Sequence, residues 1–343
     1  MPKNVEIIFA GPNNGEYFDL ISKISMKSYE LPLNKIRISN IIELYKIIVR
    51  EKIDIAHSNG KGAGFQTRIL SLLFQNTQFV HVHHGIHFIG RSVKNMVSIL
   101  LEKCFSRLTT QVFVSNSELK KGLKHKISGI NYAVINNCIH KINDQKGALS
   151  ENDLPSDYIL CVSRFDPIKN IELLVNAFSK ICIKFSNLKL LIIGDAVNKY
   201  EVEYYKKIMD LCNQLNLSEN VIIKSKITNM MPYYKNARML VSTSLGEGLP
   251  LSLIEGLYYE TPIIASNVSG NKDVVNSKCA ILHDNSLNEL IYSIKFLLSN
   301  DSFDYRNKLV AIGKKKLNEQ FSTNLFRRKY MELYNNLLFK GKL

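Results

Sequence analysis

The segment STSLGEGLPLSLIEGLYYETPIIASN, residues 242–267, decides the fold class of this chain. It starts as the end of an apolar strand and turns at residues 246–250, which include two glycines and a proline. A helix then begins near Leu251, and the apolar run PIIASN follows that helix. Parallel neighbouring strands need such a crossover helix between them. The segment therefore predicts one strand–helix–strand unit of a parallel sheet.

The same alternation of apolar strands and helix-length stretches extends over most of the chain. In the second half, the further strand-like runs are YILCVSR at 158–164, LKLLIIGD at 188–195, NVIIKS at 220–225 and ARMLVST at 237–243. In the first half they are VEIIFAG near the start and the runs at 54–58, 78–84, 111–116 and 132–136. The helix-length stretches include 41–51 and 92–108. This pattern predicts an α/β protein with two doubly wound, Rossmann-like domains.

The segment KINDQKGALSENDLPSD at 141–157 separates the two runs of strands and helices. It is polar, contains Gly147 and Pro155, and breaks the apolar alternation. A chain of 343 residues is also about twice the usual domain length. We therefore expect one domain at residues 1–150 and a second from residue 151 onward. Ligands of such domains bind at the carboxyl ends of the strands.

The composition is that of a globular protein in a reducing compartment. Hydrophobic residues make up 45% and charged residues 22% of the chain, which argues against disorder. The six cysteines are scattered and form no C-x-x-C pair, so we expect neither a disulfide framework nor a zinc site. No apolar run approaches the length of a membrane span, and the first residues lack a signal-peptide pattern. We therefore expect a cytoplasmic location.

The formal net charge of +15 favours an anionic partner such as nucleic acid, phospholipid or a phosphorylated substrate. Residues 1–150 hold 20 Lys and Arg against 10 Asp and Glu, whereas residues 151–343 hold 25 against 20. The stretch 91–108 has an apolar stripe and four basic residues, which fits an interfacial helix and equally a core-facing one. The lysines at 120, 121, 124 and 126 favour the first alternative. We expect peripheral attachment to anionic lipid on the inner face of the plasma membrane.

The segment at 242–267 also carries candidate chemistry, because a glycine-rich turn that enters a helix offers unpaired backbone N–H groups to a diphosphate. Glu247 lies in the turn and Glu255 lies two helical turns later. Carboxylates at these places suit sugar and ribose hydroxyls. Alternatively, Glu247 only complements the helix dipole and Glu255 is a solvated residue. The helix is apolar on several sides, which favours the first interpretation.

A second group of polar residues follows the strand at 158–164. Arg164 ends that strand, Lys169 lies in the loop, and a helix begins near Asn170. Two cations on one strand-to-helix loop can hold a diphosphate leaving group. The alternative interpretation makes Asn170 a helix N-cap and Lys169 a surface residue.

These two stretches resemble the retaining glycosyltransferases of family 4, which have the GT-B fold of two Rossmann-like domains with parallel sheets facing a central cleft. The resemblance rests on Glu247 and Glu255 separated by seven residues, on a following glycine-rich turn at Ser269-Gly270, and on the pattern Arg164, Lys169 and Asn170. Ser163 stands where a glycine usually precedes the arginine.

The resemblance implies roles for these residues. Glu247 would hold a sugar hydroxyl and Glu255 the ribose, while Arg164 and Lys169 would stabilise the departing nucleoside diphosphate without a metal or a cofactor. Further donor contacts would come from the start of the helix, at Gly248, Leu249, Pro250 and Leu251.

In the first half the resemblance is to bacterial capsule, exopolysaccharide and O-antigen transferases. His84-Gly85 matches a His-Gly pair that faces the transferred sugar, and Gly11 and Gly15 match a turn near the diphosphate. His81 and His83 share one strand face, which favours packing over a metal site. The stretch 134–140 departs from the family pattern, so no role passes to His140.

The last helix, at about 325–343, resembles the family's C-terminal helix. That helix would complete the first domain and leave residues 151–324 as the nucleotide-sugar domain.

The implied function is transfer of a hexose from a nucleotide diphosphate sugar, UDP by family frequency, to a lipid-linked or polysaccharide-precursor acceptor. Alternatives are a nucleotide-sugar 2-epimerase of the same architecture and a nucleic-acid-binding protein. The basic residues match no recognition module, which argues against nucleic acid. A nicotinamide dehydrogenase is disfavoured because no G-x-G-x-x-G follows the first strand.

Overall fold

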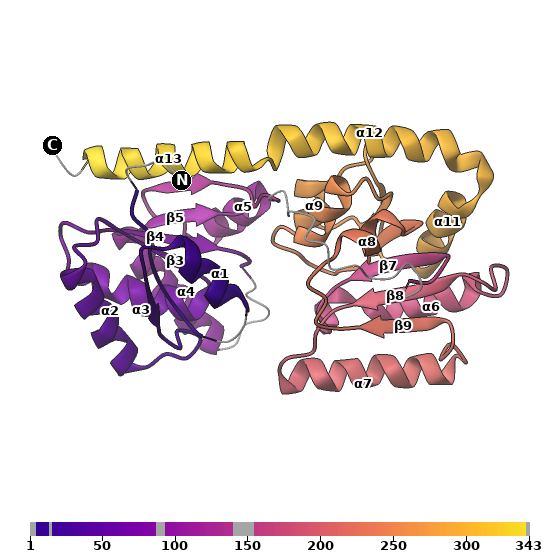
Figure 1. Ribbon diagram of the computed structural model, residues 1–343, viewed down its shortest axis with the longest axis horizontal. Coiled ribbons are helices and arrows are strands. Elements are labelled where there is room, and N and C mark those ends of the chain that lie inside the picture. The colour runs from indigo at the N-terminus through magenta and orange to yellow at the C-terminus, as the bar shows by residue number, and fades with distance from the viewer. Residues whose placement is uncertain (1–4, 14–15, 87–92, 140–153, 341–343) are drawn as a thin grey trace. The chain divides into compact units, whose positions relative to one another are not determined.

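The computed structural model describes residues 5–13, 16–86, 93–139 and 154–340. The chain divides into two compact units. Figure 1 colours the chain from indigo at its N-terminus to yellow at its C-terminus. Unit 1 comprises Met1–Ile135 and Tyr330–Leu343, and unit 2 comprises Asn136–Lys329. The division falls at residue 135, ahead of the boundary at 150 that we expected from the sequence. All paired strands are parallel, as the sequence predicted.

Unit 2 contains a six-stranded sheet in the order β12-β11-β10-β7-β8-β9. Its strands are β7 Tyr158–Val162, β8 Lys189–Ile193, β9 Val221–Lys224, β10 Met239–Ser242, β11 Ile263–Ser266 and β12 Ile281–His283. Its helices are α6 Ile171–Ile181, α7 Lys199–Gln214, α8 Met231–Lys235, α9 Leu251–Tyr258, α10 Ser269–Val274, α11 Leu287–Leu298 and α12 Phe303–Gln320. The five strands expected here are confirmed. The sequence did not predict β12, and β7 ends at Val162 rather than at Arg164.

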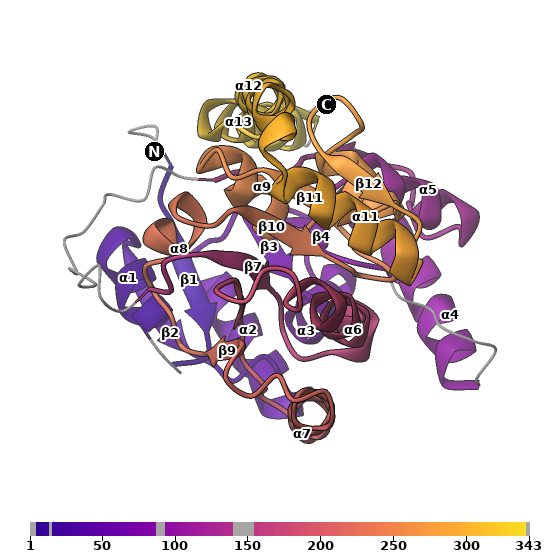
Figure 2. The same cartoon turned by 90° about the vertical axis from the view of Figure 1, so that its right-hand side faces the viewer.

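Two layers of helices hold the sheet of unit 2. On one face, α6, α7 and α11 pack over alternate residues of β7, β8 and β10 in one large buried apolar cluster. The helices α6 and α11 lie side by side there (Figure 2). On the other face, Gly256 brings α9 close to the sheet, since a Cβ at this position would lie 2.8 Å from a methyl carbon of Leu240. This close packing fixes the start of α9 beside the end of β10.

Unit 1 contains a four-stranded sheet, β3-β4-β5-β6, and a separate parallel pair, β1-β2. The strands are β1 Ile8–Gly11, β2 Lys27–Glu30, β3 Ile55–Asn59, β4 Gln78–His83, β5 Thr110–Phe113 and β6 Tyr132–Val134. The helices are α1 Glu16–Ile24, α2 Ile38–Arg50, α3 Lys61–Ile69, α4 Val93–Leu108 and α5 Asn116–Lys124. The sequence did not predict β2, because KSYE has neither an apolar run nor a clear alternation.

Helix α4 leaves most of its apolar side chains in contact with solvent and projects from unit 1 at the right of Figure 2. Phe105 is buried and makes an edge-to-face contact with Phe65. In contrast, the exposed residues are Met96, Val97, Leu100, Leu101 and Leu108. The core-facing alternative for this helix is therefore wrong. No helix within the described ranges is long and apolar enough to cross a membrane.

The last helix, α13 Thr323–Lys340, contacts both units in turn. Near its start, the Thr323 hydroxyl donates to the carbonyl of Ile139 in unit 2 (2.9 Å). Later along the helix, Tyr330 and Tyr334 lie against the ring of His57 in unit 1. A single helix thus supplies side chains to the packing of each unit.

Candidate functional site

The loop after β7 is shaped by its own side chains. The Asp166 carboxylate accepts a hydrogen bond from the N–H of Ile168 (3.0 Å) and so fixes a short 3₁₀ turn at Pro167–Lys169. Asn170 follows with a φ of 51°, a left-handed conformation that asparagine tolerates better than most residues. Asn170 occupies the N-cap position of α6, as the alternative interpretation had it, but its side chain makes no capping hydrogen bond.

The loop after β10 is hydrogen-bonded to the loop after β7. The N–H of Leu245 donates to the carbonyl of Ile168 (2.7 Å). The hydroxyl of Thr243 lies within hydrogen-bond distance of the carbonyls of Lys169 (3.0 Å) and Asn170 (2.9 Å). Residues about 75 positions apart therefore form one rigid strand-end region. The two polar stretches singled out in the sequence meet here.

Lys169 and Glu247 are in direct contact at this region, with 2.6 Å between Nζ and Oε1. The hydroxyl of Ser244 donates to the same oxygen, also at 2.6 Å. The side chains of Lys169 and Glu247 are only 17% and 12% exposed. The surface-residue alternative for Lys169 is therefore wrong. Both donors bind Oε1, which leaves Oε2 of Glu247 able to accept from another group.

Gly270 packs against the backbone of Glu247. A Cβ at residue 270 would lie 2.4 Å from the Glu247 carbonyl oxygen, so only glycine allows this approach. The sequence predicted a turn at Ser269-Gly270, but these residues begin the short helix α10. We call Lys169, Ser244, Glu247 and Gly270 the Glu247 cluster.

Glu255 lies further along α9 and is bound by a buried tyrosine. The hydroxyl of Tyr234 in α8 donates to Oε2 of Glu255 (2.6 Å). Burial raises the pKa of the Glu255 carboxyl above its usual value, and the bond from Tyr234 opposes that rise. Glu255 is partly buried, so the solvated-residue alternative is wrong.

Arg164 contacts a different carboxylate from Lys169. Its guanidinium lies 3.2 Å from Oε1 of Glu201, and its side chain is 64% exposed. Glu201 also forms the capping box of α7 with Asn198. The paired cations predicted from the sequence thus each have a carboxylate partner, and Arg164 keeps most of its surface open to solvent.

The remaining predicted residues of unit 2 form the start of α9. Gly248, Leu249 and Pro250 are buried, and Pro250 precedes the first helical residue, Leu251. Pro250 makes no side-chain capping hydrogen bond. The Leu251 side chain is exposed. Among the described residues, the first-turn N–H groups of α9 therefore have no side-chain acceptor, as an anion site needs.

In unit 1, His84 follows β4 and is an exposed residue whose imidazole is partly desolvated, which lowers its pKa. Its Nε2 lies 3.0 Å from the Asn59 amide oxygen at the end of β3. Gly85 is the next residue, and Gly11 ends β1 with its carbonyl accepting from Leu31 (2.8 Å). Gly15 and His140 lie outside the described residues.

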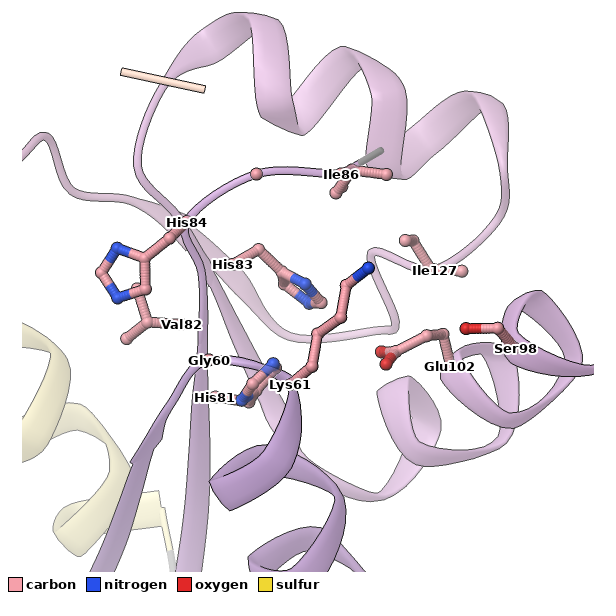
Figure 3. Close-up of a pocket in the computed structure, with 11 residues that line it drawn as sticks. Gly60, Lys61, His81, Val82, His83, His84, Ile86, Ser98, Glu102 and Ile127 are labelled. Carbon is pink, nitrogen blue, oxygen red and sulfur yellow. The ribbon is translucent and has the colours of Figure 1, made fainter. Parts of the chain in front are cut away.

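A small pocket lies beside His84 at this strand end, with a volume of about 130 Å³. Figure 3 shows the Lys61 side chain extending through it between His83 and Glu102. The Glu102 carboxylate accepts two hydrogen bonds from the buried Arg68 guanidinium (2.7 and 2.8 Å). The pocket is similar in size to the roughly 150 Å³ cavity that holds a benzene ring.

The buried histidines of β4 pack as predicted. The rings of His81 and His83 lie 4.6 Å apart, and each makes a hydrogen bond, to Ser58 and Gln111 respectively. Burial lowers the pKa of both imidazoles. Within the described ranges, no three His, Cys, Asp or Glu side chains are grouped to hold a metal ion.

Comparison with known proteins places this geometry in a family. Residues 144–316, which include the Glu247 cluster and Glu255, match the family described as "Glycosyl transferases group 1". The chain belongs to this family. It is a glycosyltransferase.

The named relatives of this glycosyltransferase include bacterial glycosyltransferases. The chain is 24% identical to the "capsular polysaccharide biosynthesis glycosyltransferase CapM" of Staphylococcus aureus, over 88% of this chain and 81% of CapM. It is 26% identical to the "UDP-Gal:alpha-D-GlcNAc-diphosphoundecaprenol alpha-1,3-galactosyltransferase" of Escherichia coli, over 86% and 75% of the two chains. The crystal structure of HepE from Anabaena in complex with UDP-glucose matches with a TM-score of 0.78 and 15% identity, over 96% and 99% of the chains. That likeness confirms the GT-B fold.

Sequence reasoning missed several residues that shape this glycosyltransferase's strand ends. Ser244 precedes Glu247 by three residues, but nothing in the sequence shows that its hydroxyl turns back to the carboxylate. Glu201 could have been found, since N-x-x-E before a helix is a variant of the capping-box pattern. Tyr234 and Lys61 have no sequence signal, because their contacts depend on how α8 and α3 pack.

Proposed function

We propose that this glycosyltransferase is a retaining enzyme of family 4 that takes a hexose from a UDP-sugar. The observation that carries the proposal is the contact between Lys169 and Glu247 beside the uncapped start of α9. This arrangement offers a cation and backbone N–H groups to a diphosphate, and a carboxylate oxygen to a sugar hydroxyl. HepE is named for its complex with UDP-glucose, and the Escherichia coli relative for UDP-galactose, which favours UDP as the nucleotide.

In the proposed reaction the bond between the anomeric carbon and the diphosphate oxygen breaks, and negative charge develops on the diphosphate. Lys169, Arg164 and the first N–H groups of α9 stabilise that charge. Preorganised donors of this kind are usually the largest single contribution to catalysis. The acceptor hydroxyl bonds to the anomeric carbon and gives its proton to the departing phosphate. No metal or cofactor enters this scheme.

The carboxylates position the donor in this scheme. Oε2 of Glu247 accepts from a hydroxyl of the transferred sugar, and Glu255 accepts from the ribose. In unit 1, the resemblance assigns His84 and Gly85 a place beside the transferred sugar, and Gly11 a place near the diphosphate. The pocket next to His84 holds a lysine and a carboxylate, which suits a sugar ring with both donors and acceptors.

We further propose that the acceptor is a lipid-linked saccharide used in surface polysaccharide synthesis. The named relatives include a capsule enzyme and one acting on a diphosphoundecaprenol-linked sugar. The exposed apolar residues of α4 and the exposed Lys120, Lys124 and Lys126 suit an anionic membrane surface that carries such an acceptor.

A thermal-shift panel with UDP, GDP and ADP tests the donor proposal. A nucleotide that binds only the folded protein raises its midpoint by mass action, and we expect UDP alone to do so. The variants Lys169→Met and Glu255→Gln should reduce the shift. No shift with any nucleoside diphosphate would contradict the donor site, and isomerisation of a free UDP-sugar without an acceptor would favour an epimerase.

Vesicle sedimentation tests the membrane proposal. We expect binding to vesicles that contain anionic lipid, and little binding to neutral vesicles. Leu100→Glu should weaken it, whereas the matched change Ile183→Glu, at an exposed apolar residue of unit 2, should not. Equal binding of wild type to neutral vesicles would contradict the proposal.

A further inference from the structure

Glu255 presents two chemically different oxygens. Oε2 accepts the hydrogen bond from Tyr234 at 2.6 Å. Oε1 receives no hydrogen bond from any described residue, and it is not among the buried side-chain atoms without a partner. Oε1 is therefore not fully buried, and among the described residues only Oε2 is held by a hydrogen bond.

Tyr234 is itself firmly held. Its side chain is fully buried, and its ring stacks on Tyr259 with 5.4 Å between centroids. The hydroxyl of Thr261 donates to the Tyr234 carbonyl (2.8 Å). The phenol of Tyr234 thus has a fixed position, and the oxygen it binds has one too.

We infer that Tyr234 is a positioning residue for nucleotide binding: its hydroxyl fixes Oε2 of Glu255 and favours the ionised carboxylate, so that Oε1 can accept from the ribose hydroxyls. This inference rests on the proposed role of Glu255 in holding the ribose. Tyr234 itself is buried and would act only through Glu255.

The electrostatics support this arrangement. Desolvation raises the pKa of Glu255, and the bond from Tyr234 lowers it. The pKa of Tyr234 is well above its usual value, chiefly through burial, so the phenol remains a donor at all pH values of interest. Tyr259 and Cys161 also face Tyr234, and the pKa of Cys161 is raised to about 12 by burial, so that thiol stays neutral. Among the described residues no Lys, Arg or His forms an ion pair with Glu255. Loss of the Tyr234 hydroxyl should therefore raise the pKa of Glu255 further.

Tyr233 provides a matched control. It precedes Tyr234 in α8 and is also fully buried, and its hydroxyl has no hydrogen-bond partner in the part of the chain that the structure describes. Tyr233→Phe and Tyr234→Phe each remove one buried phenol oxygen, but only the second removes a donor to Glu255. A difference between the two variants therefore reports the hydrogen bond and not the loss of an atom.

The experiment measures UDP affinity by calorimetry from pH 5 to 8 for wild type, Tyr233→Phe, Tyr234→Phe and Glu255→Gln. Affinity should fall in acid as Glu255 is protonated. In Tyr234→Phe this fall should begin at higher pH, with about tenfold weaker binding at pH 6. Tyr233→Phe should follow wild type. Glu255→Gln should bind weakly, without the acid fall that Glu255 causes.

The outcomes separate the inference from the proposed function. If Glu255→Gln weakens binding but Tyr234→Phe keeps the wild-type pH profile, the positioning role is wrong and the ribose role stands. If Glu255→Gln binds UDP like wild type, the ribose role itself is wrong. Should Tyr234→Phe fail to fold, Tyr259→Leu removes the ring that supports Tyr234, and an unchanged pH profile there would overturn the inference.

Discussion

The carboxyl ends of the strands carry different kinds of titratable group in the two units. In unit 2, Lys169 and Glu247 form a contact of 2.6 Å that is largely shielded from solvent, and Glu255 is bound by a buried phenol. In unit 1, the end of β4 carries histidines whose pKa values are lowered by burial, so they are neutral near pH 7. Unit 2 presents an ion pair and a carboxylate held by a phenol, and unit 1 presents neutral imidazole rings beside a small pocket that also contains Lys61 and Glu102.

The apolar packing also differs between the two units. One large cluster ties α6, α7 and α11 to the sheet of unit 2. Unit 1 has smaller clusters and leaves apolar side chains of α4 exposed. The two units therefore differ in how completely their helices are packed. A large core lies beneath the strand ends of unit 2, and unit 1 leaves apolar side chains of α4 exposed to solvent.

The largest effect should come from removing the cation of the Glu247 cluster. Lys169→Met leaves the Glu247 carboxylate without its ion pair and, on the proposed mechanism, removes a charge that stabilises the leaving group, so kcat should fall about 10²- to 10³-fold. Lys180→Met, at an exposed lysine of α6, is the control and should leave kcat unchanged. A fall of less than threefold in Lys169→Met would remove the basis for treating this strand end as the donor site.

As the pH falls, unit 1 should lose folding stability before unit 2. Burial lowers the pKa of His57 from 6.5 to about 4, and it lowers those of His81 and His83. A histidine whose pKa is lowered by folding leaves the free energy of unfolding intact above its unfolded-state pKa of about 6.5. That free energy falls as the pH drops from this value through the folded-state pKa. For His57 alone the loss is on the order of 3 kcal/mol. In unit 2, His283 also has a lowered pKa.

Hydrogen exchange with mass spectrometry, corrected for the intrinsic pH dependence, measures this difference between pH 7 and 4. Peptides from β3 and β4 should lose protection first. His57→Phe removes one titrating group and should reduce the acid sensitivity of unit 1. Simultaneous opening of both units would show that the histidines do not set the acid limit.

One closely packed glycine in each unit provides a further comparison between the two units. Gly270→Ala would push a methyl group onto the Glu247 backbone, costing about 1–3 kcal/mol and lowering kcat as Glu247 moves. Gly122→Ala in unit 1 would meet the Phe113 ring at 2.6 Å and should cost stability alone. Unfolding midpoints and kcat of both variants provide the check, and an unchanged kcat in Gly270→Ala would argue against this packing as a support for Glu247.

The smallest expected effect concerns two buried serines. Ser244→Ala removes one donor to Glu247, so it should cost about 1 kcal/mol of stability and lower kcat a few-fold. Ser58→Ala removes a donor to the Val80 carbonyl and a partner of His81, and it should affect stability only. Equal kcat values in the two variants would mean that Ser244 serves the fold rather than the reaction.

Local patterns in the sequence predicted the parallel α/β architecture and most of its strands. Apolar runs separated by helix-length stretches predicted the parallel strands and α9, because burial on both faces of a parallel sheet requires such runs. The polar strand β2 and the short strand β12 lacked that signal. The sequence also singled out Lys169, Glu247 and Glu255 as candidate site residues, since each lies at a strand end or in the helix that follows, and their roles stay a prediction.

The sequence by itself thus determined the parallel α/β fold and which residue types stand at the strand ends, because both follow from short-range periodicity and spacing. Only the tertiary structure decided that Lys169 contacts Glu247, that Tyr234 binds Glu255, that Arg164 pairs with Glu201, and that α4 exposes its apolar side chains. Each of these contacts joins residues tens of positions apart, or depends on which face of a helix its neighbours cover. Hydrophobic periodicity indicates that a helix has an apolar face, but only tertiary packing decides whether other elements cover that face.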